Sequence, residues 1–379
     1  MGLLRDIARE HKTVSLVGMA KNAGKTTAMN YLIAQAEDEG VRLGVTSTGR
    51  DGESVDVVTG TEKPKVYLTE DTLVAVPAGL YDLSGAGLEI LRMTEFSSPL
   101  GQVMLCRVAE AGYVQVAGPV TTAGQRRICA EMLAAGVDLV LIDGAIDRKS
   151  IAAPDASDAI ILSTGAALSR NMTKAAEETG YATELFGLPV LEDAAAREAI
   201  AARPDRLLAI GSPAGGAAGG ALAVPLEMKT GLRAGARIRE ALAVFDKAEA
   251  GGGARADKAN EGGGGSRGGA SGADGKSGAG MFYIYVPGAL TDGMLSGLEP
   301  KTLSGAAFVV TDPTKIFLDR LNYKRLKARG LRIFTMAGVK VAAVTVNPTS
   351  PEGYSFDSGE FIEAVRAVTG GIPVIDVRM

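Results

Sequence analysis

The chain has 379 residues, of which 46% are hydrophobic and 22% are charged, and its formal net charge is −4 at pH 7. At roughly 100 to 200 residues per domain this length predicts two or three domains, and the charge balance argues against wholesale disorder and against nucleic acid as a partner. Cys106 and Cys129 are too few for a disulfide framework and form no CxxC pair, so we expect two buried, reduced thiols. The first twelve residues hold no apolar stretch long enough for a signal peptide or a membrane span, which favours a cytoplasmic protein with no membrane segment.

The amino-terminal part alternates short β-rich runs with helical patterns, which predicts an α/β fold with a mainly parallel sheet and helices on its faces. The first run, Val14 to Val17, precedes a glycine-containing loop and a predicted helix from about Thr26 to Glu39. Further strands of this sheet are expected at Arg42 to Val45, Leu139 to Ile142 and Ala159 to Leu162. Three pieces joined by short turns predict antiparallel strands inserted in the sheet or extending it, namely Leu88 to Phe96, Gln102 to Val108 and Tyr113 to Val116.

The loop after the first strand has the residue types of a phosphate-binding loop. With the start of the helix it reads Gly18, Met19, Ala20, Lys21, Asn22, Ala23, Gly24, Lys25, Thr26 and Thr27. In such a loop the backbone N–H groups point at the phosphates, a glycine permits close approach, a lysine reaches the β and γ phosphates and a hydroxyl holds magnesium. Gly24, Lys25 and Thr26 are of the types that meet the last three needs, between a strand and a helix as the motif requires.

This loop departs from the standard pattern at one position. The pattern has a glycine five residues before Gly24, where this chain has Met19, whereas Gly18 lies one residue earlier. The loop is therefore one residue longer than the standard one, or it is anchored differently. The alternative interpretation is an ordinary strand-to-helix turn in which Gly-Lys-Thr occurs by chance.

The segment Lys21 to Thr27, KNAGKTT, resembles the loop of the SIMIBI class of P-loop proteins, which includes molybdenum-cofactor accessory GTPases and dethiobiotin synthetase. The resemblance implies a nucleotide switch, a metallochaperone or an ATP-using synthetase. The signature lysine of that class would fall at Ala20, one residue before Lys21.

Two polar segments at predicted strand ends complete the expected nucleotide site. Asp143 ends the apolar run that starts at Leu139, so its carboxylate is expected at the carboxyl edge of the sheet, where it orders magnesium or its waters; a turn-capping Asp is the alternative. In the loop from Thr46 to Glu53, we expect Asp51 to ligate magnesium or to orient the attacking water and Arg50 to contact phosphate. The alternative there is a polar surface turn.

These assignments give three sets of residues. Nucleotide binding is assigned to Gly18, Asn22, Ala23, Gly24, Lys25, Thr26, Thr27 and Arg50. Catalysis is assigned to Lys25, Asp51 and Asp143, and magnesium binding to Thr26, Asp51 and Asp143.

Three further features are open between a functional and a structural interpretation. Gly118 to Thr122 forms an anion site at the start of a helix or, as we favour, a helix start capped by one of its threonines. Asn347 contacts a nucleotide base or a substrate or, as we favour slightly, begins a turn with Pro348. His11 is the only histidine, which excludes a histidine dyad within one chain, and we expect it at the surface.

A change of composition divides the chain. From Gly251 to Gly280 there are 13 glycines in 30 positions and no large apolar side chain, which predicts a flexible linker. We therefore predict a nucleotide-binding domain over residues 1–250, a linker over residues 251–280 and a smaller α/β domain over residues 281–379. The expected strands of the domain over residues 281–379 are Phe282 to Val286, Ala307 to Val310, Val341 to Val346 and Pro373 to Val377. Its helices are expected near Lys315 to Ala328 and Ser358 to Val368.

Several segments resemble one narrower family. They are Thr46 to Glu53 (TSTGRDGE), Asp143 to Ser150 (DGAIDRKS), Ile161 to Ser169 (ILSTGAALS), Asp312 to Lys315 and Asn347 to Tyr354 (NPTSPEGY). These segments are similar to an accessory protein found with the adenosylcobalamin-dependent lysine 5,6-aminomutase, where it is regarded as a reactivase subunit. The resemblance implies an ATP-dependent protein that helps to exchange damaged cobalamin on a partner, which is the aminomutase or a second reactivase subunit.

The expected function is that of an accessory protein that binds and hydrolyses ATP with Mg²⁺. ATP is expected rather than GTP because the guanine motif Asn-Lys-x-Asp is absent. The alternative is a synthetase of the dethiobiotin-synthetase kind that activates a small carboxylate with ATP. A third hypothesis is a regulatory nucleotide-binding module without catalysis.

Overall fold

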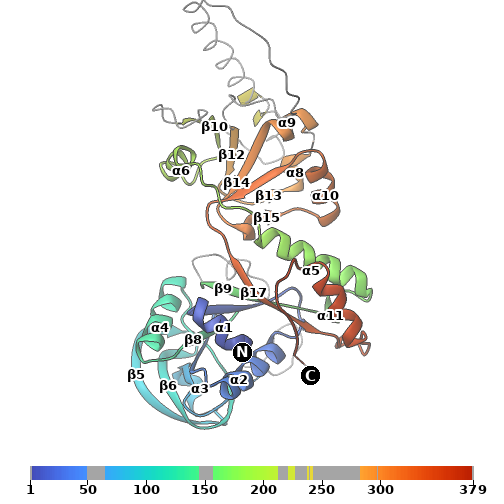
Figure 1. The fold of residues 1–379 in the computed structure, drawn as a ribbon. Helices are drawn as coiled ribbons and strands as arrows, with labels where there is room; N and C mark the ends of the chain where they lie inside the picture. The colour runs from blue at the N-terminus through green and yellow to red at the C-terminus, as the bar shows by residue number, and fades with distance from the viewer. Residues whose placement is uncertain are drawn as a thin grey trace, which may run out of the picture. The chain divides into compact units, whose positions relative to one another are not determined.

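The computed structural model describes residues 2–48, 65–144, 157–211, 221–226, 237–238, 240–241, 282–296 and 298–377. Within these ranges the chain is an α/β protein with a large, mostly parallel sheet (Figure 1). The chain divides into two compact units, Met1–Gly187 with Val339–Met379, and Leu188–Gly338. Across the described ranges, no helix combines the length and the apolar character that a membrane crossing needs.

The first unit is built on a nine-stranded sheet with the order β18-β17-β9-β1-β8-β2-β4-β6-β5. Its strands are β1 (Thr13–Gly18), β2 (Leu43–Ser47), β4 (Leu73–Pro77), β5 (Gly87–Ser98), β6 (Gly101–Glu110), β8 (Leu139–Asp143), β9 (Ala159–Gly165), β17 (Lys340–Asn347) and β18 (Val374–Asp376). Every neighbouring pair from β18 to β4 is parallel, whereas β6 is antiparallel to both β4 and β5. The mainly parallel sheet and the antiparallel extension by β5 and β6 are therefore confirmed.

Helices cover both faces of this sheet. They are α1 (Leu3–Glu10), α2 (Lys25–Glu39), α3 (Ala78–Tyr81), α4 (Thr122–Ala134), α5 (Met172–Phe186) and α11 (Ser358–Arg366). Leu139 and Leu141 of β8 pack in one core with α1 and α2, while Val140 and Ile142 pack with α4 on the other face. Because side chains alternate along a strand, a strand that is covered on both faces needs an unbroken apolar run, which is what β8 has.

The third predicted antiparallel strand does not join this sheet. β7 (Gly112–Val114) pairs instead with β3 (Val66–Leu68) in a separate two-stranded antiparallel sheet. Tyr67 and Tyr113, which are directly opposite each other in this pair, make an edge-to-face contact with ring centroids 5.2 Å apart. The local pattern predicted a strand here but not its partner, because pairing depends on residues that lie far away in the sequence.

The only histidine was expected at the surface, and this is wrong. His11 caps the carboxyl end of α1 through its backbone N–H and is only 8% exposed. Burial lowers the pKa of its imidazole, and the charge of Lys340 acts in the same direction. The two thiols are buried as expected, and burial raises the pKa of Cys106 to about 11 and that of Cys129 to about 12.

The second unit contains a five-stranded sheet with the order β11-β10-β12-β14-β16. Its elements are α6 (Ala194–Ala201), β10 (Leu208–Gly211), β11 (Leu222–Pro225), β12 (Phe282–Val286), β13 (Leu290–Thr291), α8 (Asp292–Leu295), α9 (Pro300–Gly305), β14 (Ala306–Val310), β15 (Ile316–Phe317), α10 (Arg320–Ala328) and β16 (Arg332–Thr335). The last three strands of the order are parallel, β10 is antiparallel to both neighbours, and β13 pairs with β15. The helix expected from Lys315 begins only at Arg320, because Asp319 caps it there with two hydrogen bonds.

The structure divides the chain differently from the sequence-based domain prediction. β10, in the predicted first domain, pairs with β12, in the predicted last domain. β17, α11 and β18 were also assigned to the last domain, but they complete the nine-stranded sheet of the first unit. A glycine-rich composition indicates where a segment lacks the apolar surface to fold, and it carries no information on which flanking strands pair. The predicted linker itself lies outside the described residues.

Thiol accessibility tests the core of the first unit. Native protein at mildly alkaline pH is expected to react with Ellman's reagent very slowly, because both thiols are buried and their pKa values are raised. The same protein in concentrated guanidinium chloride is expected to release two equivalents of chromophore per chain, one for each cysteine. Fast reaction of either thiol in the native protein would contradict the packing described here.

A chain that ends at Gly338 tests the division into units. It lacks β17, which pairs with β9 from Lys340 to Asn347 and buries Val344 and Val346 completely. We expect the first unit to lose its cooperative unfolding transition, because burial of a few large apolar side chains at about 1.5–3 kcal/mol each is comparable with the stability of a domain. Urea titration followed by circular dichroism measures this, and an unchanged transition would support the sequence-based division instead.

Candidate functional site

The predicted site residues that the structure describes gather at one edge of the nine-stranded sheet. β17, β9, β1, β8 and β2 are adjacent and parallel, so their carboxyl ends meet at the same edge. The loop from Gly18 to Gly24 follows β1 at this edge, and Asp143 ends β8 beside it. Ser47 and Asn347 are the last residues of β2 and β17. Edges of this kind are where open α/β sheets bind their ligands.

The loop between β1 and α2 is held by its backbone. The N–H of Met19 donates to the carbonyl oxygen of Ser163 in β9, at 2.9 Å, and the N–H of Ala23 donates to Ala20 at 3.2 Å. The φ angles of Asn22 and Gly24 are +64° and +92°, a region that asparagine tolerates and glycine enters freely. The φ angle of Met19 is not positive, so the backbone conformation at this position does not require the glycine of the standard pattern. The backbone bond to Ser163 continues the pairing of β1 with β9 into the start of the loop.

The start of α2 leaves backbone N–H groups without a side-chain cap. Gly24 is the residue before the helix, and a glycine has no side chain that could cap the first turn. The first N–H groups of a helix have no partner within the helix, and the helix dipole makes this end positive. The 15-residue helix therefore presents donors and partial positive charge to an anion at the edge of the sheet.

Lys25 and Asp143 are in direct contact. The Nζ of Lys25 lies 2.5 Å from Oδ1 of Asp143 and also donates to the backbone carbonyl oxygen of Gly144. The lysine side chain is 15% exposed and the aspartate side chain 30%. The expectation that the end of β8 lies beside the loop after β1 is therefore confirmed. Parallel pairing of Leu16 with Asp143 fixes this arrangement.

The end of β2 is fastened to the same residue. Ser47 Oγ and the N–H of Thr48 donate to the carbonyl oxygen of Asp143, at 3.2 Å and 3.1 Å. The predicted site residues Arg50 and Asp51 follow directly, and they lie outside the described residues. The chain that leads to them is therefore bonded to Asp143 at Ser47 and Thr48.

The sequence left the role of Asn347 open, with a turn slightly favoured over a contact with a ligand. Its Oδ1 accepts a hydrogen bond from the N–H of Thr349 at 3.2 Å, so the turn is confirmed. The structure adds its location, because a methyl group built on Gly24 would lie only 2.6 Å from the Cβ of Asn347. A polar residue at the end of an apolar run is the pattern that also singled out Asp143. The sequence therefore indicated that Asn347 ends a strand, but not that it lies against Gly24.

The helix start at Thr121 is a cap, as favoured. Thr121 Oγ1 accepts a hydrogen bond from the N–H of Gly124 at 3.1 Å. Four residues on from this cap, Gln125 is 2% exposed and donates through Nε2 to Thr46 Oγ1 at 3.1 Å. Gln125 was not singled out in the sequence, where a glutamine inside a helix carries no pattern that distinguishes it from a surface residue.

The residues present fit a magnesium ion that is bound together with a nucleotide. Within the described part of the chain, no three His, Cys, Asp or Glu side chains form a group that could hold a metal by themselves. Magnesium ordinarily keeps several waters and takes only one or two protein ligands, with nucleotide phosphates supplying the rest. The hydroxyl of Thr26 and the carboxylate of Asp143 are oxygen ligands of this kind.

No protein-family model, curated protein or solved structure matches the chain.

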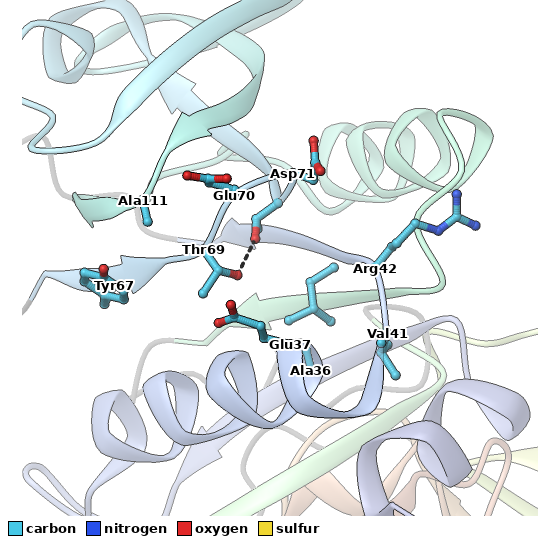
Figure 2. A pocket seen from close by; sticks show the side chains of 12 residues that line it. Ala36, Glu37, Val41, Arg42, Tyr67, Thr69, Glu70, Asp71 and Ala111 are labelled. Atoms are coloured by element: carbon cyan, nitrogen blue, oxygen red, sulfur yellow. Dashed lines mark hydrogen bonds between the residues drawn. The ribbon is translucent and has the colours of Figure 1, made fainter.

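A cavity of about 450 Å³ lies at the other end of α2. Figure 2 shows the carboxylates of Glu37, Glu70 and Asp71 around it. The hydroxyl groups of Thr69 and Thr72, which also line it, are 3.3 Å apart. Among the described residues that line it, none is a predicted site residue. The predicted nucleotide site and this cavity are therefore at different ends of the same helix.

Replacement of Gly24 by alanine tests the geometry of the loop. The new methyl group meets Asn347 at 2.6 Å, and φ at this position is +92°. Gly353→Ala is the matched control, since its φ is +86° and nothing lies within 4 Å of the new methyl group. We expect Gly353→Ala to lose about 1 kcal/mol from backbone strain alone, and Gly24→Ala to lose clearly more. Equal losses in urea unfolding would show that Asn347 does not crowd Gly24.

Proposed function

We propose that this protein binds and hydrolyses ATP at the loop between β1 and α2, and that it is an accessory protein to another enzyme. The observation that carries the proposal is the contact of 2.5 Å between Lys25, at the start of α2, and Asp143, at the end of the neighbouring strand. A lysine for phosphate and a carboxylate for magnesium are the two charged groups that a nucleotide-hydrolysing P-loop needs. Here they converge on a helix start without a side-chain cap.

The proposed roles follow from position. Backbone N–H groups from Asn22 to Thr26 surround the β and γ phosphates, with Gly18 and Thr27 at the two ends of this loop. Lys25 neutralises charge on the phosphates, and the hydroxyl of Thr26 and the carboxylate of Asp143 orient magnesium or its waters. When bound, magnesium supplies the charge that offsets the transferred phosphoryl group. Arg50 and Asp51 keep their proposed roles in phosphate contact and in orienting the attacking water.

The accessory role is supported by where the family-like segments fall. Four of the five segments that resemble the aminomutase accessory protein include the carboxyl ends of β2, β8, β9 and β17. These ends share one sheet edge with the loop after β1. Segments around a γ phosphate that change order on hydrolysis are how nucleotide switches act on partners. An adenosylcobalamin-dependent aminomutase, or a second reactivase subunit, is the proposed partner.

Replacement of Lys25 tests the nucleotide site. Lys25→Ala is expected to weaken ATP binding roughly 10- to 100-fold and to remove turnover, because one charged hydrogen bond contributes about 1.5–3 kcal/mol. Isothermal titration and phosphate release from ATP and GTP measure the two effects. Lys12→Ala is the matched control, because Lys12 is exposed and precedes β1 at the opposite edge of the sheet. Full activity of a folded Lys25→Ala protein would refute the assignment.

The partner is tested by the same assay. Lys25-dependent phosphate release is expected to rise when lysine 5,6-aminomutase and cobalamin are added to the wild-type protein. Turnover that ignores the aminomutase but depends on a small carboxylic acid would favour a synthetase of the dethiobiotin-synthetase kind. Tight ATP binding without turnover in any mixture would indicate a regulatory module.

A further inference from the structure

The two charged groups of the proposed nucleotide site occupy each other in this structure. Lys25 Nζ is 2.5 Å from Asp143 Oδ1 and donates a second hydrogen bond to the carbonyl oxygen of Gly144. Both partners belong to β8 and the residue after it, so the lysine side chain is directed to the neighbouring strand. Two of the three donors of the amine are therefore taken by the protein.

This contact competes with the proposed task of each residue. Lys25 cannot direct its full charge at a phosphate while its amine is bonded to Asp143 and Gly144, and the charge of Asp143 is not free for magnesium while it neutralises Lys25. In the part of the chain that the structure describes, Lys25 is the cation that pairs with Asp143. If the lysine leaves for a phosphate, the carboxylate is left beside an anion with no cation, and like charges at close range repel each other.

We propose that Lys25 and Asp143 form a latch that magnesium nucleotide opens and that nucleotide without magnesium does not. The latch rests on the nucleotide site proposed above and adds its regulation. With magnesium bound, Asp143 would keep a cation beside it when Lys25 turns to the phosphates, so both side-chain charges would stay paired. The resting contact thus makes the site selective for the magnesium complex, which is the hydrolysable form.

The main chain of the same residue holds the end of β2. The carbonyl oxygen of Asp143 accepts hydrogen bonds from Ser47 Oγ and from the N–H of Thr48. These bonds go to the main chain of Asp143 and not to its carboxylate, so they hold the end of β2 beside the latch.

The decisive variant is Asp143→Asn, which keeps the size of the side chain and removes its charge. In wild type, magnesium is expected to strengthen ATP binding by at least about tenfold, as a charged contact does. In Asp143→Asn, ATP in the presence of EDTA is expected to bind about tenfold more tightly than it binds to wild type, and most of the magnesium effect is lost. Glu89→Gln, which breaks an exposed pair with Arg107 at 2.8 Å, is the matched control and leaves both affinities unchanged.

A second measurement follows the lysine without any nucleotide. Acetylation by an amine reagent, read by mass spectrometry, is expected to be several times slower at Lys25 than at exposed Lys12 in wild type, because a paired, partly buried amine reacts poorly. Asp143→Asn is expected to speed the reaction at Lys25 and not at Lys12. This separates the latch from simple relief of repulsion between Asp143 and the nucleotide, which leaves the free enzyme unchanged.

The outcomes distinguish the latch from the nucleotide site. The latch would be overturned, and the proposed function kept, if wild type binds magnesium ATP but Asp143→Asn binds magnesium-free ATP no more tightly than wild type does. Acetylation of Lys25 as fast as that of Lys12 in the wild-type protein would also overturn the latch and keep the proposed function. This result does not depend on whether Asp143→Asn folds. Absence of ATP binding to wild type under every condition would refute the proposed function and the latch together.

Discussion

The parallel pairing of β1 between β8 and β9 is the constraint on which the rest of the first unit depends. Leu16 pairs with Asp143 on one side, and Gly18 pairs with Ser163 on the other. This register sets Asp143 against the loop that follows β1 and lets Ser163 accept the first backbone hydrogen bond of that loop. A shift of one residue would turn the strand's apolar side chains to the wrong face, so packing of the core also fixes the site.

The edge of the sheet is where the interior changes from apolar to polar. Within the sheet, Leu139, Leu141 and Ile161 are buried among other apolar side chains. Near the carboxyl ends, buried hydroxyl groups pair with each other, as Thr345 Oγ1 does with Ser163 Oγ at 2.9 Å. Buried polar groups are stable only when they have partners, and these pairs keep the strand ends in place while they offer a polar rim. The same edge carries the ion pair of Lys25 and Asp143.

Sequence patterns were sufficient where the structure is local. The run from Val14 to Val17, the loop and the helix to Glu39 were predicted nearly at their true bounds, because strand period, glycine and helix period all agree there. They were insufficient where long-range packing decides. His11 looked like a surface residue near a chain end, yet α1 packs on the sheet and buries it. The helix expected from Lys315 starts later, since a short strand that pairs with β13 precedes it.

The sequence by itself determined which chemical groups stand at the ends of which strands. It gave Gly24, Lys25 and Thr26 at a helix start and Asp143 after an apolar run, because these features depend on neighbours in the chain. Only the tertiary structure decided that Lys25 rests on Asp143 and that Asn347 lies against Gly24. It also decided that the chain leaves the first unit after α5 and returns at β17. The physical reason is that strand neighbours are selected by the combined burial of both sheet faces, which no local stretch of sequence contains.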